Sequence, residues 1–493
     1  MSTKNKTQLI ATGAVAAVTA IGLLTYHDAQ RRKRQFEINK PDADEEKHST
    51  VMQQTIPGVD EFNCKFNAPY GEPIAAGTEN TIYSSQCQVT MNTRRTGVNN
   101  NSIIIGAAGL GKSYNVALPN LLQQYGSYVV MDPYGAYLAT TGTFFEENDY
   151  DIRVFNLNDV TNSYCYNPFE YLRGEEDVTT LVECLIRNMK IPTQGSDDPF
   201  HEKAEKMLLE AIVFYLIHHQ DKDKQNLAMV YKLLSQMPSQ LDAIFDGVRQ
   251  YDEKDICVKK YDIFKRGSDK TTQSILITAA VHLAPFNIEA VENLTSSDDM
   301  DLKTIGDKPT ITYVIASVMN NNYTFLLSVL YSQMFDTLHY HASMNCEGQQ
   351  LKYDVRFILD EFYNIGIIPD FHIKLPAMRK YGLSCIIFGQ TVDEIKDLYR
   401  RDWEVLLNGC DTMVYLGGNK PSSMEELLKR AGGQLTIDEV QRLRDNHCIV
   451  IIKGREPFFD KKYETQSHPK ACKLGDIRTD FRLYNFDYHN TKP

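Results

Sequence analysis

The sequence has few of the features that stabilise secreted proteins or hold structural zinc. Its ten cysteines are scattered over 493 residues, without a CxxC pair or any other paired spacing typical of a zinc site. We therefore expect reduced thiols. Positive charge is also scarce, because 52 lysines and arginines face 64 aspartates and glutamates, for a formal net charge of −12. A nucleic-acid surface would have to be a local basic patch within an acidic protein.

Long apolar runs are missing except at the N-terminus. Residues 9–26, LIATGAVAAVTAIGLLTY, carry no charge and are about long enough to cross a bilayer. The basic run RRKR at 31–34 outweighs Lys4 and Lys6 ahead of the span, so the positive-inside rule places the large C-terminal body in the cytoplasm. We expect residues 1–35 to be a single-pass membrane anchor with a basic flank. A cleaved signal peptide is the alternative.

The rest of the chain divides by its hydrophobic pattern. Residues 36–98 are polar and predict a linker and a domain edge. Short buried strands then alternate with turn and helix signals over 99–169 and again over 291–493, which is typical of a parallel α/β sheet. Between them, 170–290 contains amphipathic helical patterns and predicts an inserted all-α domain. The expected strands are NTIYSS, SIIIG, SYVVM, DIRVFN, TITYVIA, VRFILD, SCIIFG, TMVYLGG and CIVIIKG.

A phosphate-binding loop follows the strand SIIIG. The stretch GAAGLGKS has glycines at 106, 109 and 111 and then Lys112 and Ser113, which matches the P-loop spacing between a strand and a helix. Glycines let backbone N–H groups face the phosphates, while Lys112 reaches the terminal phosphates and the Ser113 hydroxyl is suited to Mg²⁺. We therefore predict binding of ATP and Mg²⁺, with Gly106, Gly109, Gly111, Lys112 and Ser113 as the nucleotide-binding residues.

Two strands end in an aspartate that could assist the metal. Asp360 ends VRFILD and is followed by Glu361, whereas Asp132 ends SYVVM without a second acid. In-line attack on a γ-phosphate needs an oriented water. We assign Asp360 to Mg²⁺ and Glu361 to water activation, and we expect Asp132 to shape a turn near the site. The alternative is that Asp360 and Glu361 only cap the following helix.

Two further polar residues are candidates for the catalytic site. Gln390 ends the strand after the Asp-Glu strand, where an amide can sense the γ-phosphate or position water. Arg379, in PAMRKYG, is a candidate to contact a phosphate across a subunit boundary, although a plain surface arginine explains it almost as well.

The motifs GAAGLGKS, DPYG, FHEKAE, ILDEFYNIGIIPDF, FGQT and NGCDTMVYLGG occur in this order over roughly residues 99–470. In this the chain resembles the TraG/TraD-type coupling proteins of conjugative type IV secretion. The resemblance implies a RecA-like P-loop ATPase that is anchored in the membrane by N-terminal segments and assembles into a homo-hexamer. It also implies that ATP hydrolysis drives relaxase-bound DNA, and possibly proteins, into a secretion channel.

The resemblance carries functional roles onto matching positions. It implies nucleotide and Mg²⁺ binding by Lys112 and Ser113, metal and water roles for Asp360 and Glu361, and phosphate sensing by Gln390. Arg379 stands at a spacing before Gln390 similar to that of a family arginine implicated in phosphate contact. The helices of 170–290 correspond to the family's all-α domain, which is thought to recognise transfer substrates.

The chain also departs from the family pattern. Tyr134 and Ala136 stand where the family has Lys and Glu in a DPKGE-like turn, and His201 stands where an aromatic residue, usually Trp, is common. Most relatives carry two membrane spans, and only one is found here.

The function has alternatives. The basic and aromatic residues of 259–270, KKYDIFKRGSDK, suit phosphate contact with some base stacking, although a solvated helix face explains them as well. The second hypothesis is a docking platform that binds relaxase or effector proteins through residues 170–290 and uses ATP only to switch conformation. An FtsK-like or HerA-like DNA translocase is the third hypothesis.

Overall fold

The computed structural model describes residues 80–189, 199–317, 323–475 and 483–491. All of them belong to one compact unit, residues 59–493. The predicted anchor, residues 1–35, and most of the predicted linker lie outside the described residues. No helix within the described ranges has both the length and the apolar character that a membrane span requires.

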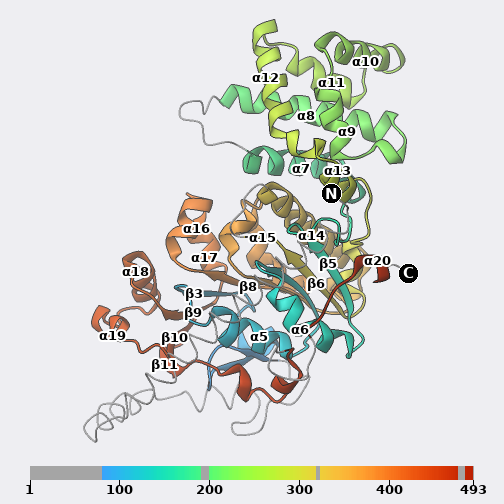
Figure 1. The fold of residues 1–493 in the computed structure, drawn as a ribbon. Helices are drawn as coiled ribbons and strands as arrows, with labels where there is room; N and C mark the ends of the chain where they lie inside the picture. Colours follow the sequence, from blue (N-terminus) through green and yellow to red (C-terminus); the bar gives the residue numbers. More distant parts are fainter. Residues whose placement is uncertain (1–79, 190–198, 318–322, 476–482, 492–493) are drawn as a thin grey trace, which may run out of the picture. The chain divides into compact units, whose positions relative to one another are not determined.

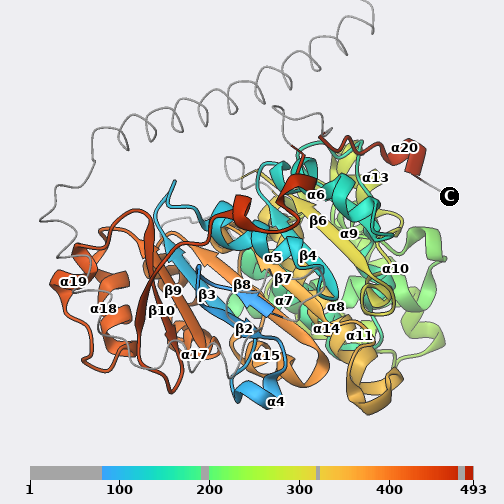
Figure 2. The same cartoon turned by 90° about the horizontal axis from the view of Figure 1, so that it is seen from below.

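The core of the structure is a nine-stranded sheet with the order β11-β10-β9-β3-β8-β7-β4-β6-β5 (Figures 1 and 2). The strands from β9 to β5 in this order are parallel. A separate antiparallel pair is formed by β1 and β2. The strands are β1 (Asn80–Ile82), β2 (Gln88–Thr90), β3 (Ser102–Gly106), β4 (Ser127–Asp132), β5 (Asp151–Asn156), β6 (Thr310–Ile315), β7 (Val355–Leu359), β8 (Leu383–Gly389), β9 (Thr412–Gly417), β10 (His447–Ile452) and β11 (Phe458–Lys461).

The sheet is mostly parallel, as expected, but its last two strands make it mixed. β10 runs antiparallel to β9, and β11 antiparallel to β10. The last two strands are joined by a short connection in which Gly454 has a φ of +74°, and such a tight turn can join only antiparallel strands. The inner strands β3, β4, β6, β7 and β8 are buried along their whole length, as expected for a sheet covered on both faces.

Helices cover both faces of the sheet. α5 and α6 lie on one face, and α14, α15 and α16 lie on the other (Figures 1 and 2). α14 is a long helix, and its side chains are mostly buried in its N-terminal half. The helices outside the helical segment are α4 (Thr93–Thr96), α5 (Leu118–Leu122), α6 (Ala136–Glu146), α14 (Thr324–Asn345), α15 (Phe371–Ala377), α16 (Val392–Tyr399), α17 (Trp403–Asn408), α18 (Pro421–Arg430), α19 (Ile437–Gln441) and α20 (Tyr488–Thr491).

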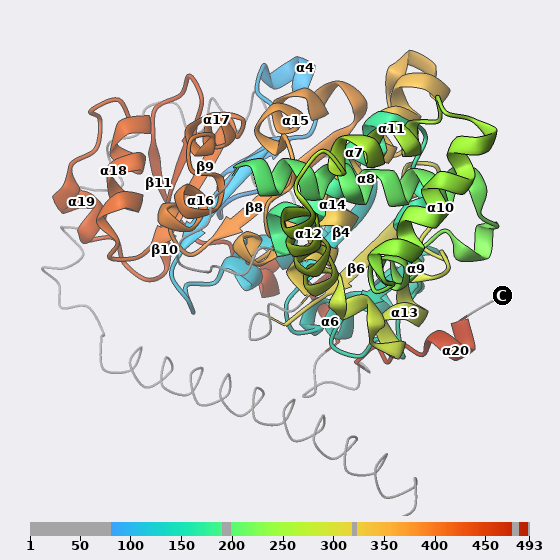
Figure 3. The same ribbon diagram turned by 90° about the horizontal axis from the view of Figure 1, so that it is seen from above.

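Between β5 and β6 the described residues form helices and no strand. α8 lies at the centre of this helical segment and packs against α7, α11 and α12 (Figure 3). Its inward residues, such as Leu208 and Ile212, are fully buried. The helices are α7 (Glu175–Met189), α8 (Pro199–His219), α9 (Leu227–Leu234), α10 (Pro238–Tyr251), α11 (Ile256–Phe264), α12 (Asp269–His282) and α13 (Glu289–Thr295).

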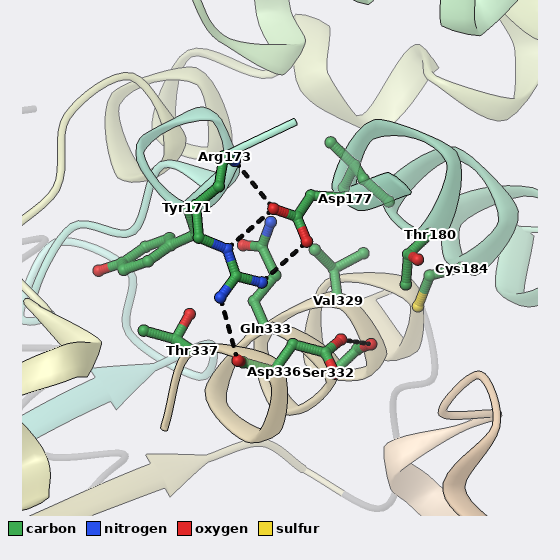
Figure 4. Close-up of a pocket in the computed structure, with 11 residues that line it drawn as sticks. Tyr171, Arg173, Asp177, Thr180, Cys184, Val329, Ser332, Gln333, Asp336 and Thr337 are labelled. Atoms are coloured by element: carbon green, nitrogen blue, oxygen red, sulfur yellow. Dashed lines mark hydrogen bonds and ion pairs between the residues drawn. The ribbon is translucent and has the colours of Figure 1, made fainter. Parts of the chain in front are cut away.

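An arginine joins the start of the helical segment to α14 (Figure 4). The Arg173 guanidinium donates to both carboxylate oxygens of Asp177 and to the backbone carbonyl of Asp336, and it lies 4.3 Å from the centre of the Tyr340 ring. The cavity beside it offers about 10 Å³, which is room for about one water. The contacts of Arg173 therefore connect the helical segment to α14, and the cavity is too small for a ligand larger than water.

Candidate nucleotide-binding site

The phosphate loop lies at the carboxyl end of β3, between the ends of β8 and β9. Gly109 and Gly111 have φ of +79° and +88°, in the region that favours glycine. A Cβ on Gly111 would lie 1.8 Å from Oδ1 of Asn115, so any side chain there would displace Asn115. The π-helix η1 (Lys112–Ala117) begins directly after the loop and continues into α5. A glycine loop that leads into a helix N-terminus is an arrangement that binds phosphate.

Asp360 lies opposite the phosphate loop, directly after β7. Its Oδ2 accepts hydrogen bonds from Ser113 Oγ at 3.0 Å and from the Tyr137 hydroxyl at 2.8 Å. Burial raises the pKa of the Asp360 carboxyl, and the two hydroxyl donors act against this rise. The structure thus brings together the carboxylate and the hydroxyl that the sequence assigned to Mg²⁺.

Glu361 occupies a strained backbone position beside the lysine of the loop. Its φ is +48°, and an uncommon φ of this kind in a residue other than glycine often occurs at a functional site. The carboxylate lies 3.6 Å from Lys112 Nζ and accepts a hydrogen bond from Gln390 Nε2 at 3.2 Å. Glu361 precedes the short helix η8 (Phe362–Ile365), but its side chain makes no capping hydrogen bond. The capping alternative is therefore wrong for Glu361.

Lys112 and Gln390 complete the group. Lys112 Nζ donates to the Gly106 carbonyl at 3.0 Å, so the ammonium is folded back over its own loop. Gln390 directly follows β8, the strand between β3 and β7, and its backbone N–H donates to the Glu394 carboxylate at 2.9 Å. Because the three parallel strands end at one edge of the sheet, five residues from three distant parts of the sequence converge: Lys112, Ser113, Asp360, Glu361 and Gln390.

Asp132 shapes the neighbouring turn, as the sequence predicted. Its two carboxylate oxygens accept the backbone N–H groups of Ala136 and Leu138, each at 2.9 Å. Burial raises the pKa of Asp132 to about 6. This turn starts α6 and directs the Tyr137 hydroxyl at Asp360. Sequence reasoning missed Tyr137, because no motif or spacing distinguishes it from an ordinary helix residue.

The residues present fit ATP and Mg²⁺. The left-handed glycines leave room for phosphate next to backbone N–H groups, and Lys112 supplies the positive charge. A hydroxyl and a carboxylate are oxygen ligands of the kind that Mg²⁺ prefers.

A family model described as "Type IV secretory system Conjugative DNA transfer" matches residues 73–438. The chain belongs to this family of conjugative DNA transfer proteins. The predicted resemblance to TraG/TraD-type coupling proteins is thereby confirmed.

Individual relatives of this family are distant. The conjugal transfer protein TraG of Rhizobium radiobacter is 19% identical over 394 residues, which are 78% of this chain and 60% of TraG. The chain thus spans about 60% of the length of that relative. Among solved structures, the conjugative coupling protein TrwBdeltaN70 has a TM-score of 0.61 at 14% identity, covering 83% of this chain and 90% of its own. TrwB in complex with ADP and Mg²⁺ has a TM-score of 0.58 at 15% identity, covering 78% and 88%.

The fold of this family member is therefore TrwB-like, with an α/β core built on a mixed, mostly parallel sheet.

The structure does not bring Arg379 to the site. This residue lies on the short helix η9 (Met378–Tyr381), which precedes β8, so it stands at the opposite edge of the sheet from Lys112. Its guanidinium is exposed and donates to the backbone carbonyl of Thr93 at 2.7 Å. Contact with a phosphate would need the nucleotide of another subunit.

The aromatic rings of 259–270 are not available for base stacking. Tyr261 and Phe264 are 3% and 2% exposed, and the Tyr261 ring stacks on Phe245 inside the helical segment. Two of the lysines in this stretch are also engaged, Lys260 with Glu210 and Lys265 with Asp242. The amphipathic pattern placed the aromatic rings in the core rather than toward a nucleic acid.

The departures from the family pattern lie at different places. Tyr134 is 63% exposed in the turn between β4 and α6. Ala136 takes part in that turn through its backbone alone. His201 lies near the start of α8, in the helical segment.

Proposed function

We propose that the chain is a P-loop ATPase that couples ATP hydrolysis to conjugative DNA transfer through a type IV secretion channel. The observation that carries this proposal is the convergence of Lys112, Ser113, Asp360, Glu361 and Gln390 at one edge of the sheet. Membership of the conjugative DNA transfer family supports it, as does the TrwB-like fold.

Each residue has a role that its position allows. When ATP binds, Lys112 gives up its contacts with the Gly106 carbonyl and with Glu361 and turns to the terminal phosphates. The phosphates then compensate the positive charge of the ammonium. Ser113 and Asp360 hold the metal, while Glu361 accepts a proton from the attacking water and Gln390 orients it. Mg²⁺, when bound, would neutralise negative charge on the phosphates. TrwB, which shares the fold, has been solved in complex with ADP and Mg²⁺, and this supports the cofactor assignment.

The transport function extends the proposal beyond the site. We infer that residues 9–26 anchor the protein in the cell membrane by a single pass with the ATPase body in the cytoplasm, and that six copies form a ring. The partners would be DNA, a relaxase or another secreted protein, and components of the secretion channel. In such a ring Arg379 of one subunit is available to the nucleotide of the next.

ATP hydrolysis by the full chain in detergent, with and without single-stranded and double-stranded DNA, tests the proposal. We expect turnover that DNA stimulates and that Lys112→Ala abolishes. Turnover that is indifferent to DNA would favour the docking platform, and turnover that survives Lys112→Ala would refute the site.

A further inference from the structure

Two adjacent histidines at the end of α8 share one carboxylate oxygen. His218 Nδ1 lies 3.3 Å and His219 Nε2 lies 3.0 Å from Oδ2 of Asp255, the residue that precedes α11. One possible ligand atom from each of the three residues lies within 4.8 Å of the other two. The group is in the helical segment and shares no residue with the nucleotide site. Among the residues that the structure describes, it is the only such group of three His, Cys, Asp or Glu side chains.

The two nitrogen–oxygen contacts are hydrogen bonds whose lengths also suit ligands of one metal ion. Tetrahedral zinc at about 2.0–2.1 Å from its ligands holds neighbouring ligand atoms about 3.3–3.4 Å apart. The two nitrogen–oxygen separations in the structure, 3.3 and 3.0 Å, are close to this value. Two imidazoles and a carboxylate are a ligand set that zinc and similar divalent transition metals accept. An ion could therefore enter with only small side-chain movements.

Neighbouring residues hold the ligands in place, as outer partners do at metal sites. The second oxygen of Asp255 accepts the backbone N–H of Cys257 at 2.8 Å, which fixes the carboxylate at the start of α11. The His219 ring stacks on Tyr215, whose hydroxyl accepts a hydrogen bond from Gln220. Only Oδ2 of Asp255 is thus left to face the histidines.

The location also suits a cation. Both histidines lie in the last turn of α8, where the backbone carbonyls favour positive charge. Their side chains are 42% and 32% exposed, so an ion can reach them from solvent, whereas the Asp255 side chain is only 10% exposed.

We propose that His218, His219 and Asp255 bind one zinc-type divalent transition-metal ion, with a fourth position open to water or to a side chain of a partner. The bound ion links α8 to α11, two helices that pack closely but are separated in the sequence by α9 and α10. The site would stiffen the helical segment and would offer a partner a coordination position on its surface.

The test is a titration of the full chain with Zn²⁺ in a calorimeter and with Co²⁺ followed by visible absorption, after dialysis against a chelator. We expect one ion bound with micromolar or tighter affinity and the absorption of tetrahedral Co²⁺. His219→Ala and Asp255→Asn should each weaken Zn²⁺ at this site by more than the about 10–100-fold that loss of an outer partner causes. Asn at 255 still caps α11, so that variant keeps its fold.

His341→Ala is the matched control. His341 also pairs with an aspartate, Asp307 at 2.8 Å, but this pair is not part of the three-ligand group. The control should bind Zn²⁺ as the wild type does, with unchanged stoichiometry. The proposal is overturned if the wild type binds no ion in this range, or if His219→Ala and Asp255→Asn retain the wild-type stoichiometry and affinity.

Discussion

Replacing Glu361 by glutamine should separate hydrolysis from nucleotide binding. The change keeps the size of the side chain and removes one negative charge 3.6 Å from Lys112 Nζ. The amide oxygen can still accept the hydrogen bond that Gln390 Nε2 now gives to the carboxylate. What the variant lacks is a group that can accept a proton from water.

The expected decrease in the hydrolysis rate follows from the loss of this proton acceptor. Positioned general acid–base catalysis contributes about 10²–10⁴-fold, so the barrier should rise by about 3–5 kcal/mol. The affinity for ATP, in contrast, should not decrease. In the structure Lys112 is engaged by Glu361 and by the Gly106 carbonyl, and phosphate must displace both. Neutralising Glu361 removes one competitor for the ammonium, so ATP affinity should be retained or increase.

Initial rates of phosphate release and binding of a fluorescent ATP analogue measure the two quantities on the same preparation. Glu404→Gln is the matched control, because Glu404 also pairs with a lysine, Lys429 at 3.1 Å, but on an exposed surface. We expect the control to keep the wild-type rate. A rate for Glu361→Gln within threefold of wild type would refute the water-activating role. Loss of ATP binding in that variant would show that the carboxylate organises the loop instead.

Three further predictions concern single residues. Gly111→Ala should weaken nucleotide binding by about tenfold or more in a fluorescence assay, because the left-handed φ costs about 1–2 kcal/mol and the new Cβ would overlap the Asn115 side chain. Tyr137→Phe should lower the free energy of unfolding in urea by about 1–3 kcal/mol, since Asp360 loses a buried donor. Burial lowers the pKa of His468 to about 4, so the unfolded chain binds the proton first as pH falls. The contribution of His468 to stability should therefore decrease from about pH 6.5 toward pH 4. In urea unfolding at a series of pH values, His468→Gln should remove this contribution, so the variant should lose less stability than the wild type over this range.

Much of the sheet could be read from the sequence because its inner strands are buried on both faces. Such strands are short unbroken apolar runs, and the expected strands of the main sheet are present within one or two residues of their predicted bounds, whereas β1 ends three residues before the end of NTIYSS. β11 was missed because FFDK contains two charged residues and has little alternation. The antiparallel direction of β10 could not be predicted, since strand direction depends on connections whose path a hydrophobic pattern does not encode.

The site was predictable to the extent that it follows from strand ends. Carboxyl ends of parallel strands meet at one edge, so a P-loop after β3, an Asp-Glu pair after β7 and a glutamine after β8 had to converge once these strands proved adjacent. The position of Tyr137 could not be predicted in this way. Its hydroxyl reaches Asp360 only because the Asp132 carboxylate anchors the first turn of α6. A contact made through a neighbouring turn leaves no signal in spacing.

The basic segment 259–270 shows why charge alone is weak evidence for a DNA surface. Lys260 lies 2.5 Å from Glu210, a residue 50 positions earlier whose side chain is only 1% exposed. A lysine that compensates a buried carboxylate cannot turn to a phosphate without leaving that charge unpaired, which costs several kcal/mol. Charge reversal at Lys260 should therefore damage the fold before it affects DNA. A DNA-binding surface must be sought among lysines and arginines without such partners, and changes there should alter the salt dependence of DNA-stimulated ATP hydrolysis while leaving thermal unfolding unchanged.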